Sequence, residues 1–549
     1  MFILKKPPRS HALGEPILHD DHPRPVTRRD FVSTGLMSAP AVIMAPAWLG
    51  ALLRSGNANA LSTDMQALLA ATQCNVPTAA SGIPFIAFDL AGGANLVGSE
   101  VLMGVNGGQT NFLSTAGYGK LGLPGNMVPT SSAFVSNALG LLWHSDGAIL
   151  RGILSKATTP ATAAGTNGAV IAALSQNDTG NNPHNPMYGI AKAVNKAGTT
   201  PKGKLLTLIG TQSTVSGGNS AAPTALIDPT LQPTKISQPG DAVGLVNTGG
   251  ATADPVAVAV LESQARISGG TGLYDPTATG ATAEAAFAGA LSAPGGGTPG
   301  VQLLADQVAD AKLKNSVRCA YVKSANTADA FGTPSALDPR QDANIIAGGT
   351  PIFTAADFND GDIQKTATVM KLVLGGYAAA GTITLGGYDY HDGTRASGEG
   401  RNFKAGQMIG AVLEYAHRVG APVMIYVFSD GSLSATSSID SSTGGRGKLG
   451  WQGDNQATAS TFFLVYNPTG RPTLRNGAAS QQIGFFSADG SVVSTSSPAA
   501  NSVNQLVQTV ILNYMGLLGT DAQFSTTFPM QGLGSATAQA NLVSFAPIV

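Results

Sequence analysis

The sequence predicts an α/β protein with a mostly parallel sheet covered by helices on both faces. Two apolar runs, 382–391 and 423–431, each lead into an aspartate, and an amphipathic stretch at 403–418 separates them. A strand, a helix and a second strand in this order make a parallel unit. A third apolar run at 83–90 reaches an aspartate in the same way. Because ligands collect at the carboxyl ends of such strands, we expect the functional site at that edge.

The first half of the chain is expected to be rich in turns, because Gly, Pro, Ser and Thr recur through 96–200 and 211–300. We interpret 211–300 as a loop-rich insertion. Several short elements are expected in or beside these segments: a helix over 61–82, helices near 133–142 and 186–196, a buried strand at 205–209, and helices near 255–266 and 301–315.

The second half is more regular. Asp362 is expected to cap a helix that stops at Gly375, because apolar residues recur there at helical spacing. A Ser/Gly-rich loop is expected at 431–455, followed by a buried strand at 461–466. Apolar residues at helical spacing predict a last helix at 502–518.

Charged residues make up only 11% of the 549 residues, against a usual ~25%, and the formal net charge is −1. Hydrophobic residues make up 43%, which is enough for a sizeable core. A mostly neutral, polar surface is typical of an extracytoplasmic protein. It argues against nucleic acid as a partner, because binding nucleic acid requires a basic face.

The N-terminus predicts export. The segment 27–32, Thr-Arg-Arg-Asp-Phe-Val, resembles the twin-arginine motif, and a weakly apolar stretch and Ala58-Asn59-Ala60 follow it. We expect residues 1–60 to be a cleaved signal peptide, the twin-arginine translocase to be the export partner, and the protein to be periplasmic or secreted. A membrane anchor is the alternative. No later run reaches the ~18 apolar residues of a membrane span, so none is expected after cleavage.

Cys74 and Cys319 are the two cysteines of the chain. In an oxidising compartment they could form a disulfide, and two unpaired thiols are the alternative.

The candidate site consists of Asp389, His391, Asp430 and Asp89, which all stand at expected strand ends. On a strand, residues 389 and 391 would point to the same side. Carboxylates brought close together repel each other unless a cation or a proton lies between them, so a divalent metal ion is the expected cofactor. The alternative is that each aspartate caps a following turn or helix.

Only four histidines lie beyond residue 60, at positions 144, 184, 391 and 417. A zinc site built on several histidines is therefore hard to assemble. A mixed carboxylate site for calcium, magnesium or one transition metal is easier to supply. His184, in a loop, is a further candidate ligand.

The motifs, in their order along the chain, resemble the domain-of-unknown-function family 1501, a group of twin-arginine-exported bacterial proteins similar to the alkaline phosphatases and sulfatases. The resemblance covers roughly 83–535. It is carried by short segments: Gly-Gly-Ala-Asn at 92–95, Gly-Gly-Tyr-Asp-Tyr-His at 386–391, Phe-Ser-Asp-Gly-Ser at 428–432, Gly-Asp-Asn at 453–455, Leu-Gly at 518–519 and Phe-Pro at 528–529.

The resemblance implies a single alkaline-phosphatase-like domain over 61–549, with Asp389, His391 and Asp430 as metal ligands and His184 and Asp454 as weaker candidates. It implies a metal-dependent hydrolase acting on a small anionic phosphate or sulfate ester. Two amides depart from the family pattern: Asn95 stands where an aspartate is usual, and Asn455 stands where a histidine is usual. They favour the alternative, a non-catalytic exported protein that binds or assembles an envelope component.

Overall fold

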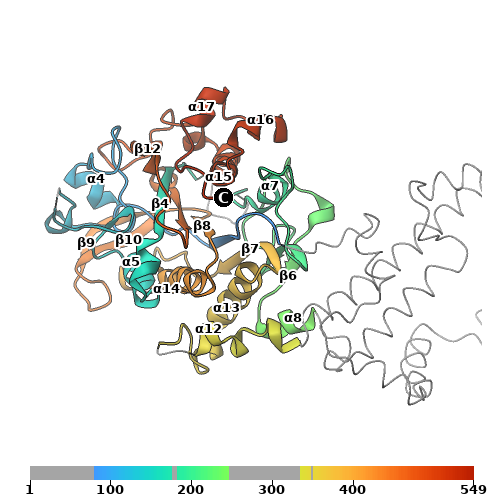
Figure 1. Ribbon diagram of the computed structural model, residues 1–549. Helices are drawn as coiled ribbons and strands as arrows, with labels where there is room; N and C mark the ends of the chain where they lie inside the picture. Colours follow the sequence, from blue (N-terminus) through green and yellow to red (C-terminus); the bar gives the residue numbers. More distant parts are fainter. Residues whose placement is uncertain (1–79, 131, 176–181, 246–333, 348–349) are drawn as a thin grey trace, which may run out of the picture. The chain divides into compact units, whose positions relative to one another are not determined.

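The computed structural model describes residues 80–130, 132–175, 182–245, 334–347 and 350–549, which all belong to one compact unit, Leu61–Val549 (Figure 1). The predicted signal peptide, both cysteines and the helices expected at 255–266 and 301–315 lie outside the described residues, as does nearly all of the helix expected at 61–82.

An eight-stranded sheet forms the centre of the described chain, in the order β13-β4-β11-β8-β1-β7-β5-β6. The expected strands at its centre are confirmed: β1 (Phe85–Leu90) lies between β7 (Ala378–Leu385) and β8 (Val423–Ser429) and runs parallel to both. The sheet is mostly parallel, as predicted, but β11 is antiparallel to both β8 and β4. The outer strands are β5 (Leu206–Gly210), β6 (Thr234–Lys235), β11 (Ser460–Tyr466), β4 (Thr166–Ala172) and β13 (Gln482–Ile483).

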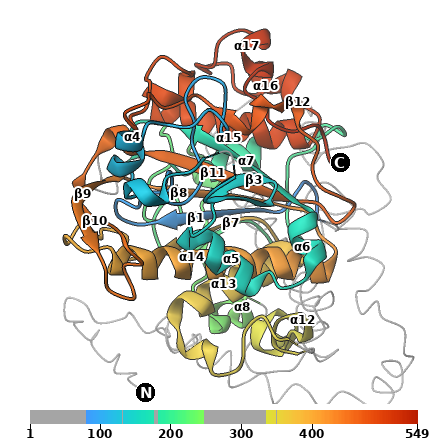
Figure 2. The ribbon, with the colours of Figure 1, turned by 90° about the vertical axis from the view of Figure 1, so that its left-hand side faces the viewer.

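Helices cover both faces of this sheet, as Figure 2 shows. One face packs against α13 (Gly361–Leu374) and α14 (Ala396–Val419), and α5 (Ala148–Lys156) lies against α14. The other face packs against α7 (Met187–Lys192) and α15 (Val503–Leu517). Residues of β1 alternate between the two apolar layers, so the strand is buried along its whole length.

Close helix packing explains the glycines where α5 meets α14. A Cβ on Gly152 would lie 2.1 Å from the backbone oxygen of Phe403, so only glycine allows the two backbones to approach this closely. The remaining described α-helices and strand β12 are short: α4 (Thr115–Lys120), α6 (Pro160–Ala164), α8 (Pro239–Gly244), α12 (Ala343–Ile346), α16 (Phe524–Thr527), α17 (Ala536–Ala540) and β12 (Arg475–Ala478).

Two segments that the sequence predicted to be a helix and a loop are β-hairpins instead. The helix expected near 133–142 is the antiparallel pair β2 (Val135–Leu139) and β3 (Leu141–His144). The loop expected at 431–455 is another pair, β9 (Leu433–Asp440) and β10 (Lys448–Asp454). The Ser/Gly-rich sequence of this hairpin does not predict strands. The hairpin is held in place by the burial of Trp451 in the main core, which is a tertiary contact.

The other helices predicted within the described residues are present with shifted ends. Helix α13 is capped by Asp360, whose carboxylate accepts a hydrogen bond from the backbone N–H of Asp362, so the cap lies two residues before the expected one. Helix α14 begins at Ala396, earlier than expected, because Asp440 of β9 accepts hydrogen bonds from the backbone N–H groups of Arg395 and Ala396.

Within 211–245, the described part of the expected insertion, β6 adds to the edge of the main sheet beside β5.

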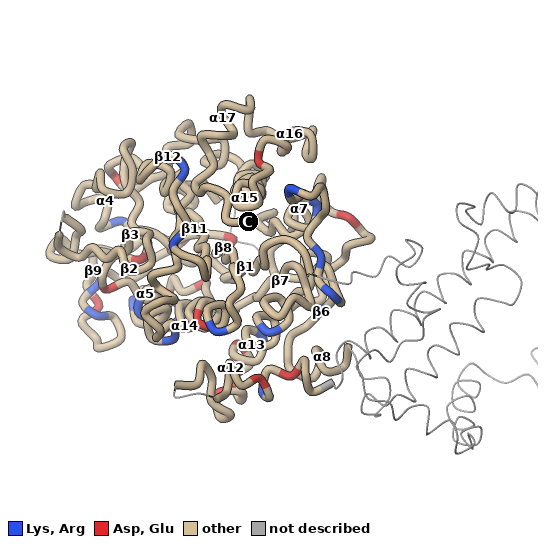
Figure 3. The backbone as a smooth tube through the Cα atoms, in the orientation of Figure 1, with Lys and Arg blue, Asp and Glu red and all other residues tan. Residues whose placement is uncertain are grey.

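Charged positions are sparse along the described chain (Figure 3). Among the described residues, no helix combines the length and the apolar character needed to cross a membrane.

Candidate metal centre

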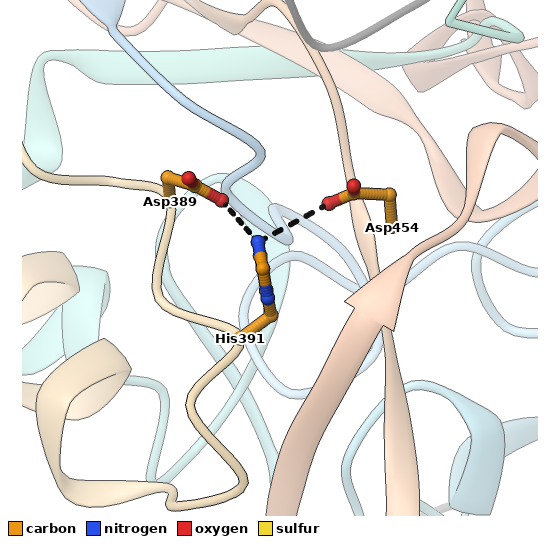
Figure 4. Close-up of side chains that lie close together, drawn as sticks. All are labelled: Asp389, His391 and Asp454. Atoms are coloured by element: carbon orange, nitrogen blue, oxygen red, sulfur yellow. Dashed lines mark ion pairs between the residues drawn. The ribbon is translucent and has the colours of Figure 1, made fainter.

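Asp389, His391 and Asp454 converge beyond the carboxyl ends of the central strands. Nε2 of His391 lies 2.7 Å from Oδ1 of Asp389 and 3.9 Å from Oδ1 of Asp454. Figure 4 shows the imidazole lying between the two carboxylates. One ligand atom from each residue lies within 4.8 Å of the other two, and all three side chains are exposed, by 40% to 63%.

The loop between β7 and α14 places Asp389 and His391. Strand β7 ends at Leu385, so the expectation that these two residues lie on the strand was wrong. They nevertheless point the same way, because the residues that alternate with them are anchored inside. Tyr388 donates its hydroxyl hydrogen bond to the backbone oxygen of Arg401. Tyr390 donates to Oδ1 of Asn402.

Asp454 comes from the hairpin that the sequence did not reveal. It is the last residue of β10 and pairs with Leu433 of β9. The next backbone N–H, that of Asn455, donates to the oxygen of Ser432 at 2.7 Å. Pairing with the segment that follows β8 therefore fixes the place of Asp454.

The donor set fits a divalent cation. Two carboxylates and one imidazole suit borderline or hard ions such as Mn²⁺, Zn²⁺ or Mg²⁺. Adjacent ligand atoms around a small cation lie about 3 Å apart, since metal–ligand bonds are about 2.1 Å. The separations of 2.7 and 3.9 Å lie on either side of that spacing, and exposed side chains can adjust by this much.

Without an ion, the contact between His391 and Asp389 needs a proton, because an unprotonated imidazole nitrogen and a carboxylate oxygen are both acceptors. A metal ion would replace that proton.

Asp89 does not belong to this group. It lies within β1, is fully buried, and faces the layer formed by α7 and α15. Its carboxylate accepts hydrogen bonds from the backbone N–H and hydroxyl of Ser220, at 2.9 and 3.2 Å, and from the hydroxyl of Thr384 at 3.4 Å. Burial raises the pKa of Asp89, and the hydrogen bonds from Ser220 and Thr384 oppose this shift.

Asp430 also lies outside the group of three. It follows β8 directly, as expected, and is 1% exposed. Its Oδ1 accepts a hydrogen bond of 2.8 Å from the backbone N–H of Gly92. Its backbone oxygen accepts from Ser175 and Asn182. This carboxylate is held by the backbone of the turn that follows β1.

His184 is buried and stacks on Phe428 of β8, with ring centroids 5.8 Å apart. Neither ring nitrogen has a hydrogen-bond partner within the described part of the chain. Burial lowers the pKa of His184 to about 4, so the imidazole is neutral at pH 7. It lies outside the group of three exposed ligands.

Asn95 and Asn455 both take part in local structure. The backbone N–H of Asn95 donates to the hydroxyl of Tyr390. The side chain of Asn455 accepts from the backbone N–H of Ala457 and caps the short 3₁₀ helix Gln456–Thr458.

Sequence reasoning missed the anchoring role of Tyr390; the alternation Tyr-Asp-Tyr-His was the available signal.

Comparison of the chain with family models, with curated proteins and with solved structures gave no match. The relationship to the domain-of-unknown-function family 1501 therefore stays a prediction from short motifs.

Proposed function

We propose that the protein binds a divalent metal ion through Asp389, His391 and Asp454, and that it is an exported hydrolase of phosphate or sulfate esters. The observation that carries the proposal is the convergence of two carboxylates and one imidazole from two separate segments. Carboxylates and imidazole are the side chains that catalytic metal sites use.

In this proposal the chain supplies ligands and leaves room for a substrate. A bound divalent ion would polarise an ester oxygen and lower the pKa of a coordinated water. Three protein ligands leave coordination positions open, as catalytic sites require. Exposure of all three side chains gives an anionic ester access from solvent.

An alkaline-phosphatase-like fold is part of the same proposal. The mostly parallel sheet, the helices on both faces and the position of the site beyond β7 support it. The Arg-Arg pair at 28–29 supports twin-arginine export.

A second candidate is an exported protein that binds or assembles an envelope component without catalysis. Asn455 favours it, since this side chain caps a 3₁₀ helix where the family pattern has a histidine. An amide used in this way is not available as a metal ligand, so the site would have one ligand fewer than the family pattern.

Metal binding is tested with the purified full-length protein, stripped with chelator and titrated with Mn²⁺, Zn²⁺ and Ca²⁺ by calorimetry. We expect one site, and about 10–100-fold weaker binding or more for Asp389→Asn. Asp392→Asn is the matched control, because it removes one charge from the same loop. The Oδ1 of Asp392 accepts a hydrogen bond from the backbone N–H of Thr394 and does not belong to the group of three ligands. A wild-type protein without metal affinity would contradict the proposal.

Catalysis is tested on p-nitrophenyl phosphate and p-nitrophenyl sulfate, with and without the bound metal. Metal-dependent turnover that Asp389→Asn removes supports the hydrolase. Metal binding without turnover on either ester supports the non-catalytic alternative.

A further inference from the structure

The turn that follows β1 is held from one side by the end of β8. The backbone N–H of Gly92 donates to Asp430 at 2.8 Å, and the N–H of Ala94 donates to the hydroxyl oxygen of Ser429 at 2.9 Å. That hydroxyl lies 2.7 Å from the backbone oxygen of Leu90 and 2.8 Å from that of Gly92. Two consecutive side chains of one strand end therefore fix the whole turn.

The same turn carries the loop of Asp389 and His391. The backbone N–H of Tyr388 donates to the oxygen of Ala91 at 3.1 Å. Gly92 lies so close to this loop that a Cβ on it would be 2.2 Å from the backbone nitrogen of Asp389. A displacement of the turn would therefore displace Asp389.

The other carboxylate of the site adjoins the turn from the opposite side. A Cβ on Gly93 would lie 3.6 Å from the backbone nitrogen of Ser432 and 3.7 Å from Oδ1 of Asp454. The strand of Asp454 is itself paired to Leu433, three residues after Asp430. Asp430 thus joins the turn that supports Asp389 to the segment that supports Asp454.

Given the metal binding proposed above, we propose that Asp430 is a positioning residue: by holding the N–H of Gly92, its carboxylate sets the spacing between Asp389 and Asp454. It acts as a hydrogen-bond acceptor and does not touch the ion. An amide oxygen accepts the same hydrogen bond, whereas an amide is a poor replacement for a carboxylate that ligates a metal.

A positioning residue and a metal ligand therefore predict opposite results for Asp430→Asn. If Asp430 positions the turn, Mn²⁺ affinity in Asp430→Asn stays within about 3-fold of wild type, and Asp430→Ala loses about 10-fold or more. The visible spectrum of the Co²⁺-loaded protein keeps its shape in Asp430→Asn. If Asp430→Asn loses as much affinity as Asp389→Asn, or if Asp430→Ala binds like wild type, the positioning role is wrong.

A measurement without metal separates this inference from the proposed function. The imidazole NMR signals of His391 report its contact with Asp389. We expect these signals to be unchanged in Asp430→Asn and shifted in Asp430→Ala, whether or not the wild-type protein binds an ion. Unshifted signals in a folded Asp430→Ala protein would overturn the inference, whereas absence of metal binding by wild type would overturn only the proposed function.

Ser429→Ala serves where Asp430→Ala does not fold, because it removes the other anchor of the same turn. The expected result is again a shift of the His391 signals. Ser437→Ala, at an exposed position of β9, is the matched control and should leave them unchanged. Identical spectra for the two serine variants would contradict the positioning role of this strand end.

Discussion

Two sets of carboxylates lie near the same edge of the sheet, and they differ in what surrounds them. Asp389 and Asp454 are exposed by 63% and 46% and face one imidazole. Asp89 and Asp430 are buried and accept hydrogen bonds from the protein itself. The comparison shows that the aspartates of the candidate site are those whose side chains remain exposed to solvent, whereas the buried ones serve as acceptors for internal donors.

Solvation explains the difference. Burying a carboxylate is costly unless donors compensate it, so a buried aspartate needs hydrogen bonds from remote segments, as Asp89 has from Ser220. An exposed carboxylate keeps its water, which a cation can displace. We therefore expect mutations of the buried set to change stability and mutations of the exposed set to change metal affinity.

The largest effect is expected for Gly92→Ala. Gly92 has φ of +130°, and the new Cβ would meet the backbone of Asp389. Strain and overpacking together should lower the free energy of unfolding by about 3 kcal/mol or more, measured by urea denaturation. Gly386→Ala, with no atom within 4 Å of its Cβ position, is the control and should change stability little. Equal denaturation midpoints for the two variants would show that the turn is not constrained.

Asp89→Ala should destabilise the protein by about 2–3 kcal/mol, because it leaves the N–H and hydroxyl of Ser220 buried without their acceptor. The corresponding change in the exposed set, Asp389→Ala, should cost less than about 0.5 kcal/mol. Denaturation curves of both variants, recorded in chelator, provide the comparison. A similar loss of stability in both would remove the distinction between the two sets.

The buried imidazole of His184 is expected to affect stability only at acidic pH. Because burial lowers its pKa from 6.5 to about 4, the unfolded chain binds the proton more readily. Above pH 6.5 the imidazole is neutral in both states and the folded protein keeps its full stability. As the pH falls toward 4, protonation of His184 in the unfolded chain lowers the free energy of unfolding by up to about 3 kcal/mol. His184→Phe should flatten the dependence of unfolding free energy on pH between 6.5 and 4. Parallel curves for wild type and variant would contradict this expectation.

The smallest effect is expected for Asn455→Ala, next to Asp454. The variant loses the hydrogen bond to the N–H of Ala457, which should cost about 1 kcal/mol or less in unfolding free energy. Metal affinity, measured by calorimetry, should remain within about 3-fold of wild type. A large loss of affinity would place Asn455 among the ligands and weaken the non-catalytic alternative.

The local pattern of the sequence was sufficient for the central strands and for α13, α14 and α15. The strands are continuous apolar runs, as burial within the sheet requires, and the helices carry apolar residues at helical spacing on the side that packs against the sheet. The hairpin β9–β10 could not be predicted in this way, because few of its residues are apolar and Trp451 is buried by distant segments. Its absence from the prediction is the reason that Asp454 ranked below Asp430 as a ligand candidate.

The sequence by itself determined that Asp389 and His391 share one side of the chain near the carboxyl end of a buried parallel strand, because two residues of alternate spacing point the same way in an extended segment. It did not determine that the strand ends before them, at Leu385. Only the tertiary structure decided that Asp454 completes the group, and that Asp89 and Asp430 face inward. The physical reason is that hydrogen-bond donors for a buried carboxylate come from segments far away in the chain, such as Ser220 for Asp89 and Gly92 for Asp430. Their positions are fixed by packing and strand pairing, which no local pattern records.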